Sequence, residues 1–208
     1  MKVFHILFAL LFSLSSIGQI FEGKMTLTNY YQSKIPNVTN EQLTAMFGSI
    51  QEYYVKDGTY KSVVNGTFVQ WQLYVNADNK LYNKYSNSDT VNWNDGAINL
   101  DKVLKSEINK NVVKILGYDC DELILTCMSG VQKYYYNAAF GIDPALYSKH
   151  LFGNWFSYVS LAKALPLKII FENAQFLAEM VVTEITPMKL DETFFKLPAN
   201  AITKQAAN

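Results

Sequence analysis

The sequence predicts a mainly β protein of the α+β kind, in which an antiparallel sheet is accompanied by short helices. Short runs of alternating apolar and polar residues recur along the chain, separated by turn-forming pairs such as Asp57-Gly58. Aromatic residues, which favour half-buried strands, make up 14% of the 208 residues. Together these observations indicate a sheet-based barrel or sandwich.

Residues 1–18 have the layout of a secretory signal peptide. Lys2 precedes an apolar run at 3–12, and small residues follow at 13–18. The apolar run is shorter than the roughly 18–20 residues that cross a bilayer, so we expect no transmembrane span. We expect cleavage after Gly18 and a periplasmic or secreted protein. The alternative interpretation is a buried N-terminal strand or helix.

The remaining length fits a single β-rich domain at 19–198 and a flexible C-terminal tail at 199–208. Charged residues make up 17% of the chain, and 18 acidic residues balance 18 basic ones. All of the basic residues are lysine. A chain without a basic excess, and without arginine to grip phosphates, is not expected to bind nucleic acid.

The first half of the domain is predicted to begin with a strand at 21–31 that places Met25 and Leu27 on one face. Thr39 or Asn40 is the candidate N-cap of a short helix. A meander follows, and within it Trp71 and Leu73 share a face. The expected elements are the helix at 41–47, strands at 50–56, 59–64, 67–76, 80–85 and 90–93, and a short helix or irregular cover at 98–108.

The second half is predicted to return to strands, with one helical interruption that begins at Pro144. Cys120 and Cys127 fall in one continuous strand, so their Cα atoms are roughly 23 Å apart and we expect no disulfide between them. The expected elements are strands at 112–118, 120–128, 131–137, 165–171 and 176–185, a helix at 144–152, an ambiguous stretch at 158–164 and a closing segment at 190–197.

Four short motifs resemble secreted bacterial domains of unknown function that are related to the periplasmic lipoprotein carriers LolA and LolB. The segment Ile115-Leu116-Gly117-Tyr118-Asp119-Cys120 resembles their "I-x-G-Y-x-C" strand. Ala164-Leu165-Pro166-Leu167-Lys168 is similar to their "G-x-P-L" segment, with alanine in place of glycine. Phe194-Phe195-Lys196-Leu197-Pro198 is similar to their closing "F-x-x-P", and Phe21-Glu22-Gly23 to their first strand. The motifs bracket most of the predicted domain.

The resemblance implies a curved antiparallel half-barrel whose concave face is covered by short helices, and which holds acyl chains in the related carriers. Lys133-Tyr134-Tyr135-Tyr136 departs from the glycine-rich or tryptophan-bearing strand of related families. No residue here matches one that defines lipoprotein transfer. An incompletely closed sheet leaves an apolar pocket, and the same side chains could instead be plain core. The candidate lining residues are Met25, Leu27, Trp71, Leu73, Tyr134, Tyr136, Ile169, Phe171, Met180 and Val182.

Catalytic motifs are missing from the predicted domain. Its one histidine, His150, lies near the end of a predicted helix, where interaction with the helix terminus is the commoner role. The sequence contains no G-x-S-x-G elbow, P-loop, dinucleotide fingerprint or metal-ligand spacing. We therefore expect no catalytic residue, metal site or cofactor.

Three functions were weighed. The first is an exported, non-enzymatic protein that holds a lipid or other apolar small molecule in the half-barrel. The alternative is an envelope-associated structural module that binds a protein partner and no small molecule. The third, an enzyme, would require a cleft that gathers His150 with carboxylates.

Overall fold

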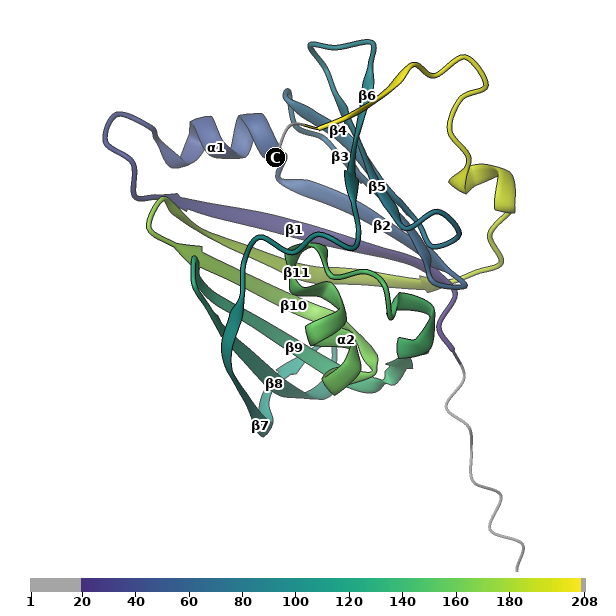
Figure 1. The fold of residues 1–208 in the computed structure, drawn as a ribbon. Coiled ribbons are helices and arrows are strands. Elements are labelled where there is room, and N and C mark those ends of the chain that lie inside the picture. Colours follow the sequence, from purple (N-terminus) through teal and green to yellow (C-terminus); the bar gives the residue numbers. More distant parts are fainter. Residues whose placement is uncertain (1–19, 207–208) are drawn as a thin grey trace, which may run out of the picture.

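The computed structural model describes residues 20–206. They form a single curved sheet of 12 strands, open between its two edge strands, with two short α-helices (Figure 1). All neighbouring strands are antiparallel except the pair β6 and β12. This architecture confirms the predicted fold class, a mainly β, curved antiparallel half-barrel. The predicted signal peptide lies outside the described residues.

The chain forms two meanders that meet in the middle of the sheet. The first runs from β1 to β6, the second from β7 to β11, and β11 then pairs with β1. The strand order is β12-β6-β5-β4-β3-β2-β1-β11-β10-β9-β8-β7. The strands are β1 (Gly23–Ser33), β2 (Ile50–Lys56), β3 (Thr59–Val64), β4 (Val69–Val75), β5 (Lys80–Tyr85), β6 (Val91–Asp95), β7 (Val103–Ile115), β8 (Tyr118–Cys127), β9 (Gly130–Gly141), β10 (Ala164–Asn173), β11 (Phe176–Pro187) and β12 (Thr203–Gln205).

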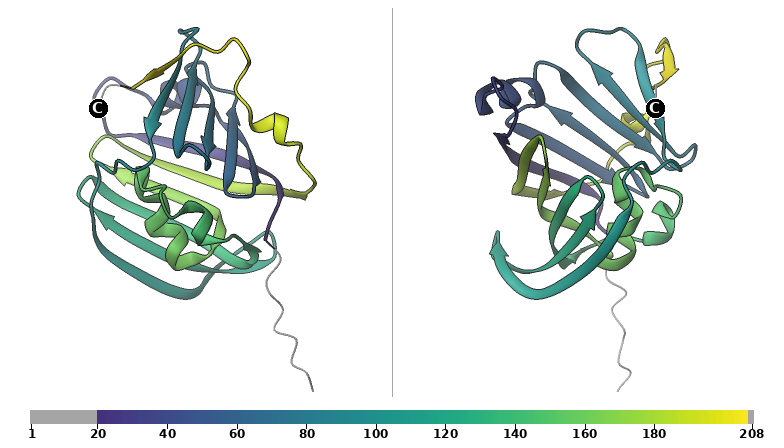
Figure 2. Two further views of the ribbon diagram at one scale, coloured as in Figure 1. Left: turned by 45° about the vertical axis from the view of Figure 1, so that its right-hand side comes forward. Right: turned by 60° about the vertical axis from the view of Figure 1, so that its left-hand side comes forward.

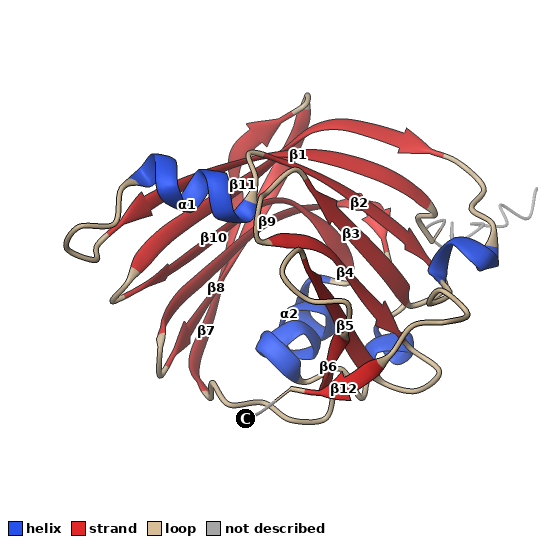
Figure 3. Cartoon of the chain, turned by 90° about the horizontal axis from the view of Figure 1, so that it is seen from above, coloured by secondary structure: helices blue, strands red, loops and turns tan. Residues whose placement is uncertain are grey.

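Helix α1 (Asn40–Phe47) connects β1 to β2 and packs beside β1. Thr39 is its N-cap, as predicted, and forms a capping box with Gln42. Helix α2 (Trp155–Ala162) and the 3₁₀ turns η1 (Pro144–Tyr147) and η2 (Phe152–Asn154) lie in the hollow of the sheet (Figure 3). The concave face is therefore covered by short helical segments, and α2 is the longest of them.

The strands β2 and β3 meet at the turn Asp57-Gly58, which the sequence predicts. Both residues have positive φ, 46° and 77°. This is the backbone of the two-residue hairpins that match the twist of the strands. A Cβ on Gly58 would also lie 2.6 Å from Leu146 Cβ, so the turn sits directly against η1.

The connection between the two meanders, residues 96–102, crosses from β6 to β7 on the open side of the sheet (Figure 2). Backbone N–H groups of Leu151 and Phe152 donate to the Gly96 carbonyl, at 2.6 and 3.0 Å. Asn99 Nδ2 donates to Asn154 Oδ1 at 2.6 Å. These bonds fix the helical cover to the crossing segment.

Three elements differ from the sequence prediction. Residues 103–115 form strand β7 rather than a short helix, because an edge strand exposed on both faces shows no apolar alternation. The predicted helix at 144–152 is one turn, η1, after which Tyr147 and His150 are both buried. The ambiguous stretch at 158–164 belongs partly to α2.

The predicted flexible tail is wrong for its central part. Thr203–Gln205 forms β12, which pairs in parallel with β6. Val91 N–H donates to the Ile202 carbonyl at 2.8 Å, and Ala206 N–H donates to the Trp93 carbonyl at 2.9 Å. The backbone bonds of the free β6 edge therefore hold a segment that has no strong strand pattern of its own.

Buried apolar residues form two clusters on opposite faces of the sheet. The neighbours Leu73 and Tyr74 of β4 are both buried but belong to different clusters, as alternation along a strand requires. The inner cluster contains Tyr74 and lies between the concave face and α2. The outer cluster gathers Leu73, Tyr82, Val91, Leu190 and Phe195, and it is covered by the segment at 188–201.

Candidate functional site

Eight of the ten predicted lining residues lie in or against the inner cluster. Met25, Leu27, Tyr134, Tyr136 and Val182 are buried. Ile169, Phe171 and Met180 are half-buried and pack against these residues. The register joins them, since Ile169 lies opposite both Met180 and Tyr134. The sequence pattern therefore identifies the concave side of β1 and β9 to β11.

The prediction is wrong for Trp71 and Leu73. Both lie on the opposite face of β4, in or against the outer cluster. The concave face of this strand instead presents Tyr74, which packs with α2 and η1 in the inner cluster. Apolar alternation shows that residues share a face, but it does not show which of two covered faces they occupy.

A cavity of about 60 Å³ lies within the concave face. Its wall combines buried and half-buried side chains from β1, β2, β10 and α2. Three of the predicted residues, Met25, Leu27 and Ile169, belong to this wall. The sequence analysis missed the other lining residues, which are Gln51, Tyr53, Trp155, Leu165 and Pro166. For Tyr53 a signal existed, because it pairs with Met25 across the β1–β2 ladder.

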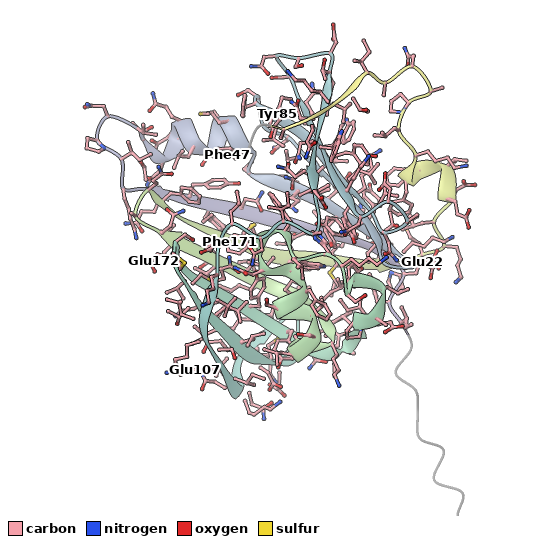
Figure 4. All side chains as sticks on the ribbon, viewed as in Figure 1. Glu22, Phe47, Tyr85, Glu107, Phe171 and Glu172 are labelled. Atoms are coloured by element: carbon pink, nitrogen blue, oxygen red, sulfur yellow. The ribbon has the colours of Figure 1, made fainter. Side chains whose placement is uncertain are left out.

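Half-buried apolar side chains continue from this cavity along β10 and β11. Ile169 belongs to the cavity wall, and Phe171 follows on the same face of β10 (Figure 4). Met180 lies across from Ile169 on β11. We name Ile169, Phe171 and Met180 the apolar strip, because they leave part of the concave face accessible beside α2.

His150 lies at the centre of an aromatic cluster next to the cavity. Its ring stacks on Tyr74, with 3.9 Å between ring centroids, and is 1% exposed. His150 Nε2 and Tyr60 Oη form a hydrogen bond of 2.9 Å. Burial lowers the pKa of His150 from 6.5 to about 3, so the imidazole is neutral at physiological pH. The predicted contact with a helix terminus is replaced by aromatic packing.

We name this group the tyrosine–histidine cluster. Its members come from β2, β3, β4, η1, α2 and the loop between η1 and η2, and neighbouring rings are 3.9 to 6.4 Å apart between centroids. Burial raises the pKa of its tyrosines, which keeps their hydroxyls neutral. The members are Tyr53, Tyr60, Tyr74, Tyr147, His150, Trp155 and Tyr158.

A larger, open hollow of about 650 Å³ lies between α1 and β1. Most of its wall is polar, and these polar groups already serve the local backbone. Asn40 Oδ1 accepts from Ser33 N–H, and Asn65 Oδ1 accepts from Ile50 N–H. Thr44 Oγ1 and Thr67 Oγ1 both donate to backbone carbonyls. Because these groups hold α1 in place, the concave cavity is the better candidate site despite its smaller volume.

The two cysteines are free and buried, at opposite ends of β8. Among residues 20–206 no group of three or more histidine, cysteine, aspartate or glutamate side chains is placed to hold a metal ion. In the same part of the chain, none of the helices has the length and apolar character of a membrane span.

Comparison with known proteins gives one structural similarity. The fold is similar to that of a LolA superfamily protein from Nitrosomonas europaea, known from its crystal structure. The TM-score is 0.38 and the sequence identity 12%, over 85% of this chain and 90% of the other. No protein-family model matches the sequence, and no curated protein matches it.

Proposed function

We propose that the protein is an exported, non-enzymatic binding protein that holds a lipid or other apolar small molecule against its concave face. The observation that carries this proposal is the apolar cavity beside Trp155, which continues into the apolar strip. Concave, mainly apolar sites with a few polar groups are the usual form of small-molecule sites.

The size of the cavity limits how the ligand lies. About 60 Å³ has room for roughly two water-sized groups, whereas a site that encloses a whole small molecule has about 300 Å³ or more. In the proposed mode only one end of the ligand enters the cavity, and its body lies along Ile169, Phe171 and Met180.

Export is supported by the layout of residues 1–18, which places the mature protein in the periplasm or outside the cell. The four motifs that resemble LolA and LolB carriers support an apolar ligand. A non-catalytic role is supported by His150, because a buried imidazole with a pKa of about 3 is a poor general base at neutral pH.

The alternative, a protein-interaction module, has its best surface at the edge strand β7. Leu104, Ile108 and Val112 are exposed there, at 61, 43 and 45%. This edge also carries a bulge between Asn109 and Val113, and several of its residues are lysine. Bulges and lysines are features by which sheet proteins prevent edge-to-edge pairing. The edge therefore favours the alternative less than the cavity favours a ligand.

Native mass spectrometry of the protein purified from the cell envelope of its own source tests the proposal. We expect co-purified apolar molecules, identified after solvent extraction, in the wild type. Ile169→Glu places a carboxylate in the cavity wall and is expected to remove them. The matched control is Ile170→Glu, at the next residue of β10, whose side chain points to the other face. A ligand-free wild type, even after incubation with lipid extract, contradicts the proposal.

A further inference from the structure

Four buried hydrogen-bonding atoms of the tyrosine–histidine cluster have no partner among the described residues. They are Tyr53 Oη, Tyr147 Oη, His150 Nδ1 and Trp155 Nε1. Only two other buried side-chain atoms in residues 20–206, on Thr26 and Asn29, share this property. Because an unpaired buried polar group costs roughly 1–3 kcal/mol, four in one cluster mark a place built to receive hydrogen bonds from elsewhere.

Two of the four atoms belong to residues that form the cavity wall, Tyr53 and Trp155. The other two belong to residues that are fully buried behind that wall. The Tyr147 ring centroid is 6.2 Å from that of Trp155, and the His150 centroid is 6.4 Å from it. The cavity is therefore apolar along β1 and β10 and has unused hydrogen-bonding capacity on its Tyr53–Trp155 side.

The charge of the site restricts what can enter. No lysine, aspartate or glutamate is among the described residues that line the cavity. His150 is neutral, and both Tyr53 and Tyr147 keep their protons at physiological pH because burial raises their pKa values. A carboxylate, phosphate or ammonium group placed here would lose its hydration without gaining a counter-charge, which is strongly unfavourable.

The available groups favour a small oxygen-bearing head. Trp155 Nε1 is a donor only, and the Tyr53 hydroxyl both donates and accepts. A hydroxyl or carbonyl oxygen satisfies both. A sugar or a phosphate is too large for about 60 Å³ of space.

We propose that the cavity binds the uncharged polar head of a single-chain amphiphile, a hydroxyl or carbonyl oxygen, through Tyr53 Oη and Trp155 Nε1. The alkyl body lies on the apolar strip. This inference rests on the proposed function and adds to it the chemical class of the ligand: a fatty alcohol, aldehyde or ketone is selected over a fatty acid or an alkylamine.

Fluorescence of Trp155 provides the test. Trp71→Phe and Trp93→Phe remove the two tryptophans that pack against the outer cluster, so Trp155 alone reports in this background. The probes are 1-dodecanol, dodecanoate, dodecylammonium and dodecane at pH 7.5. We expect 1-dodecanol to bind at least about tenfold more tightly than either ion, because an uncompensated buried charge outweighs a neutral hydrogen bond.

Tyr53→Phe in the same background removes the accepting and donating hydroxyl. We expect it to weaken 1-dodecanol binding about fivefold and to leave dodecane binding unchanged, since one neutral hydrogen bond contributes about 1 kcal/mol. Tyr54→Phe is the matched control. Its hydroxyl donates to Glu52 Oε2 at 2.9 Å on the other face of β2, so its loss should not change binding of any probe.

A second measurement needs no change in the site itself. In the single-tryptophan protein labelled with ¹⁵N, the Trp155 Nε1–H resonance should shift downfield with 1-dodecanol and much less with dodecane. Equal affinity for alcohol and ions, or an indole resonance that moves equally with alcohol and alkane, overturns the inference while the proposed function stands. Absence of binding by all four probes contradicts the proposed function as well.

Discussion

The two covered faces of β4 differ in how their polar groups are paired. In the outer cluster, Tyr82 Oη donates to Asp78 at 2.6 Å and Lys61 Nζ donates to the Phe194 carbonyl at 3.3 Å. No buried polar side-chain atom of the outer cluster, within residues 20–206, lacks a partner. In the inner cluster four such atoms lack one. The outer face is a completed core, whereas the inner face is arranged to accept a ligand.

The comparison separates two uses of aromatic residues. Both clusters are rich in tyrosine, tryptophan and phenylalanine, so composition does not distinguish them. Satisfied hydroxyls add to stability, and unsatisfied hydroxyls lower it. Substitutions that remove one group from each face should therefore change stability in different directions.

The largest expected effect concerns the outer cover. Phe195→Ala should lower the free energy of unfolding by about 3–5 kcal/mol, because Phe195 is 8% exposed and its loss leaves a cavity beside Leu73 and Tyr82. Urea unfolding followed by circular dichroism measures this. Ligand binding by the folded fraction should be unchanged. A loss below about 1 kcal/mol would show that the segment at 188–201 is only loosely attached.

The next effect is a pH dependence of the inner cluster. Between pH 6.5 and about pH 3 the unfolded chain binds a proton at His150 that the folded chain excludes. The stabilising contribution of the neutral form is complete above pH 6.5 and falls with decreasing pH, by about 1.4 kcal/mol per unit across this window. Urea unfolding at pH 4.5, 5.25 and 6.0 should give a shallower slope for His150→Gln. Parallel slopes would mean that His150 titrates normally in the folded protein.

A matched pair of buried tyrosines tests the unpaired groups directly. Tyr147→Phe removes a hydroxyl without a partner among the described residues and should leave stability unchanged or raise it by up to about 1 kcal/mol. Tyr158→Phe removes the hydroxyl that donates to the Ala164 carbonyl at 2.7 Å and should lower stability by about 1–2 kcal/mol. Thermal unfolding of both variants decides the point. Equal losses would indicate that Tyr147 Oη is hydrogen-bonded in solution.

The smallest expected effect again concerns the outer face. Lys61 Nζ lies 4.5 Å from the centroid of the Phe194 ring, and burial lowers the pKa of this lysine. Lys61→Met keeps the apolar stem and loses the cation–π contact, so stability should fall by about 0.5–1 kcal/mol. Lys114→Met, on the exposed edge β7, is the control and should change nothing measurable.

The sequence predicts the sheet and the concave wall well where only one face of a strand is apolar. Met25, Leu27 and Ile169 follow this rule, and the structure places all three in the cavity wall. The prediction fails for Trp71 and Leu73 because β4 is covered on both faces, a condition that depends on a segment more than a hundred residues later in the chain.

Edges and helical turns were the other failures, for physical reasons of their own. Strand β7 has almost no buried side chain, so hydrogen bonds to β8 alone define it. Trp155 was not among the predicted site residues, since its position depends on Gly153 and Asn154, whose positive φ values of 63° and 65° turn the chain into α2. A single sequence does not show this change of direction.

The pairing of β1 with β11 has a consequence for how the molecule forms. These central strands come from opposite ends of the domain, with Gly23 opposite Pro187. The first strand can acquire its second neighbour only when almost the whole chain has been synthesised, and such distant contacts slow folding. For a chain that is exported as proposed, late closure of the sheet keeps the polypeptide extended during translocation, and the sheet can form once the last strand has crossed.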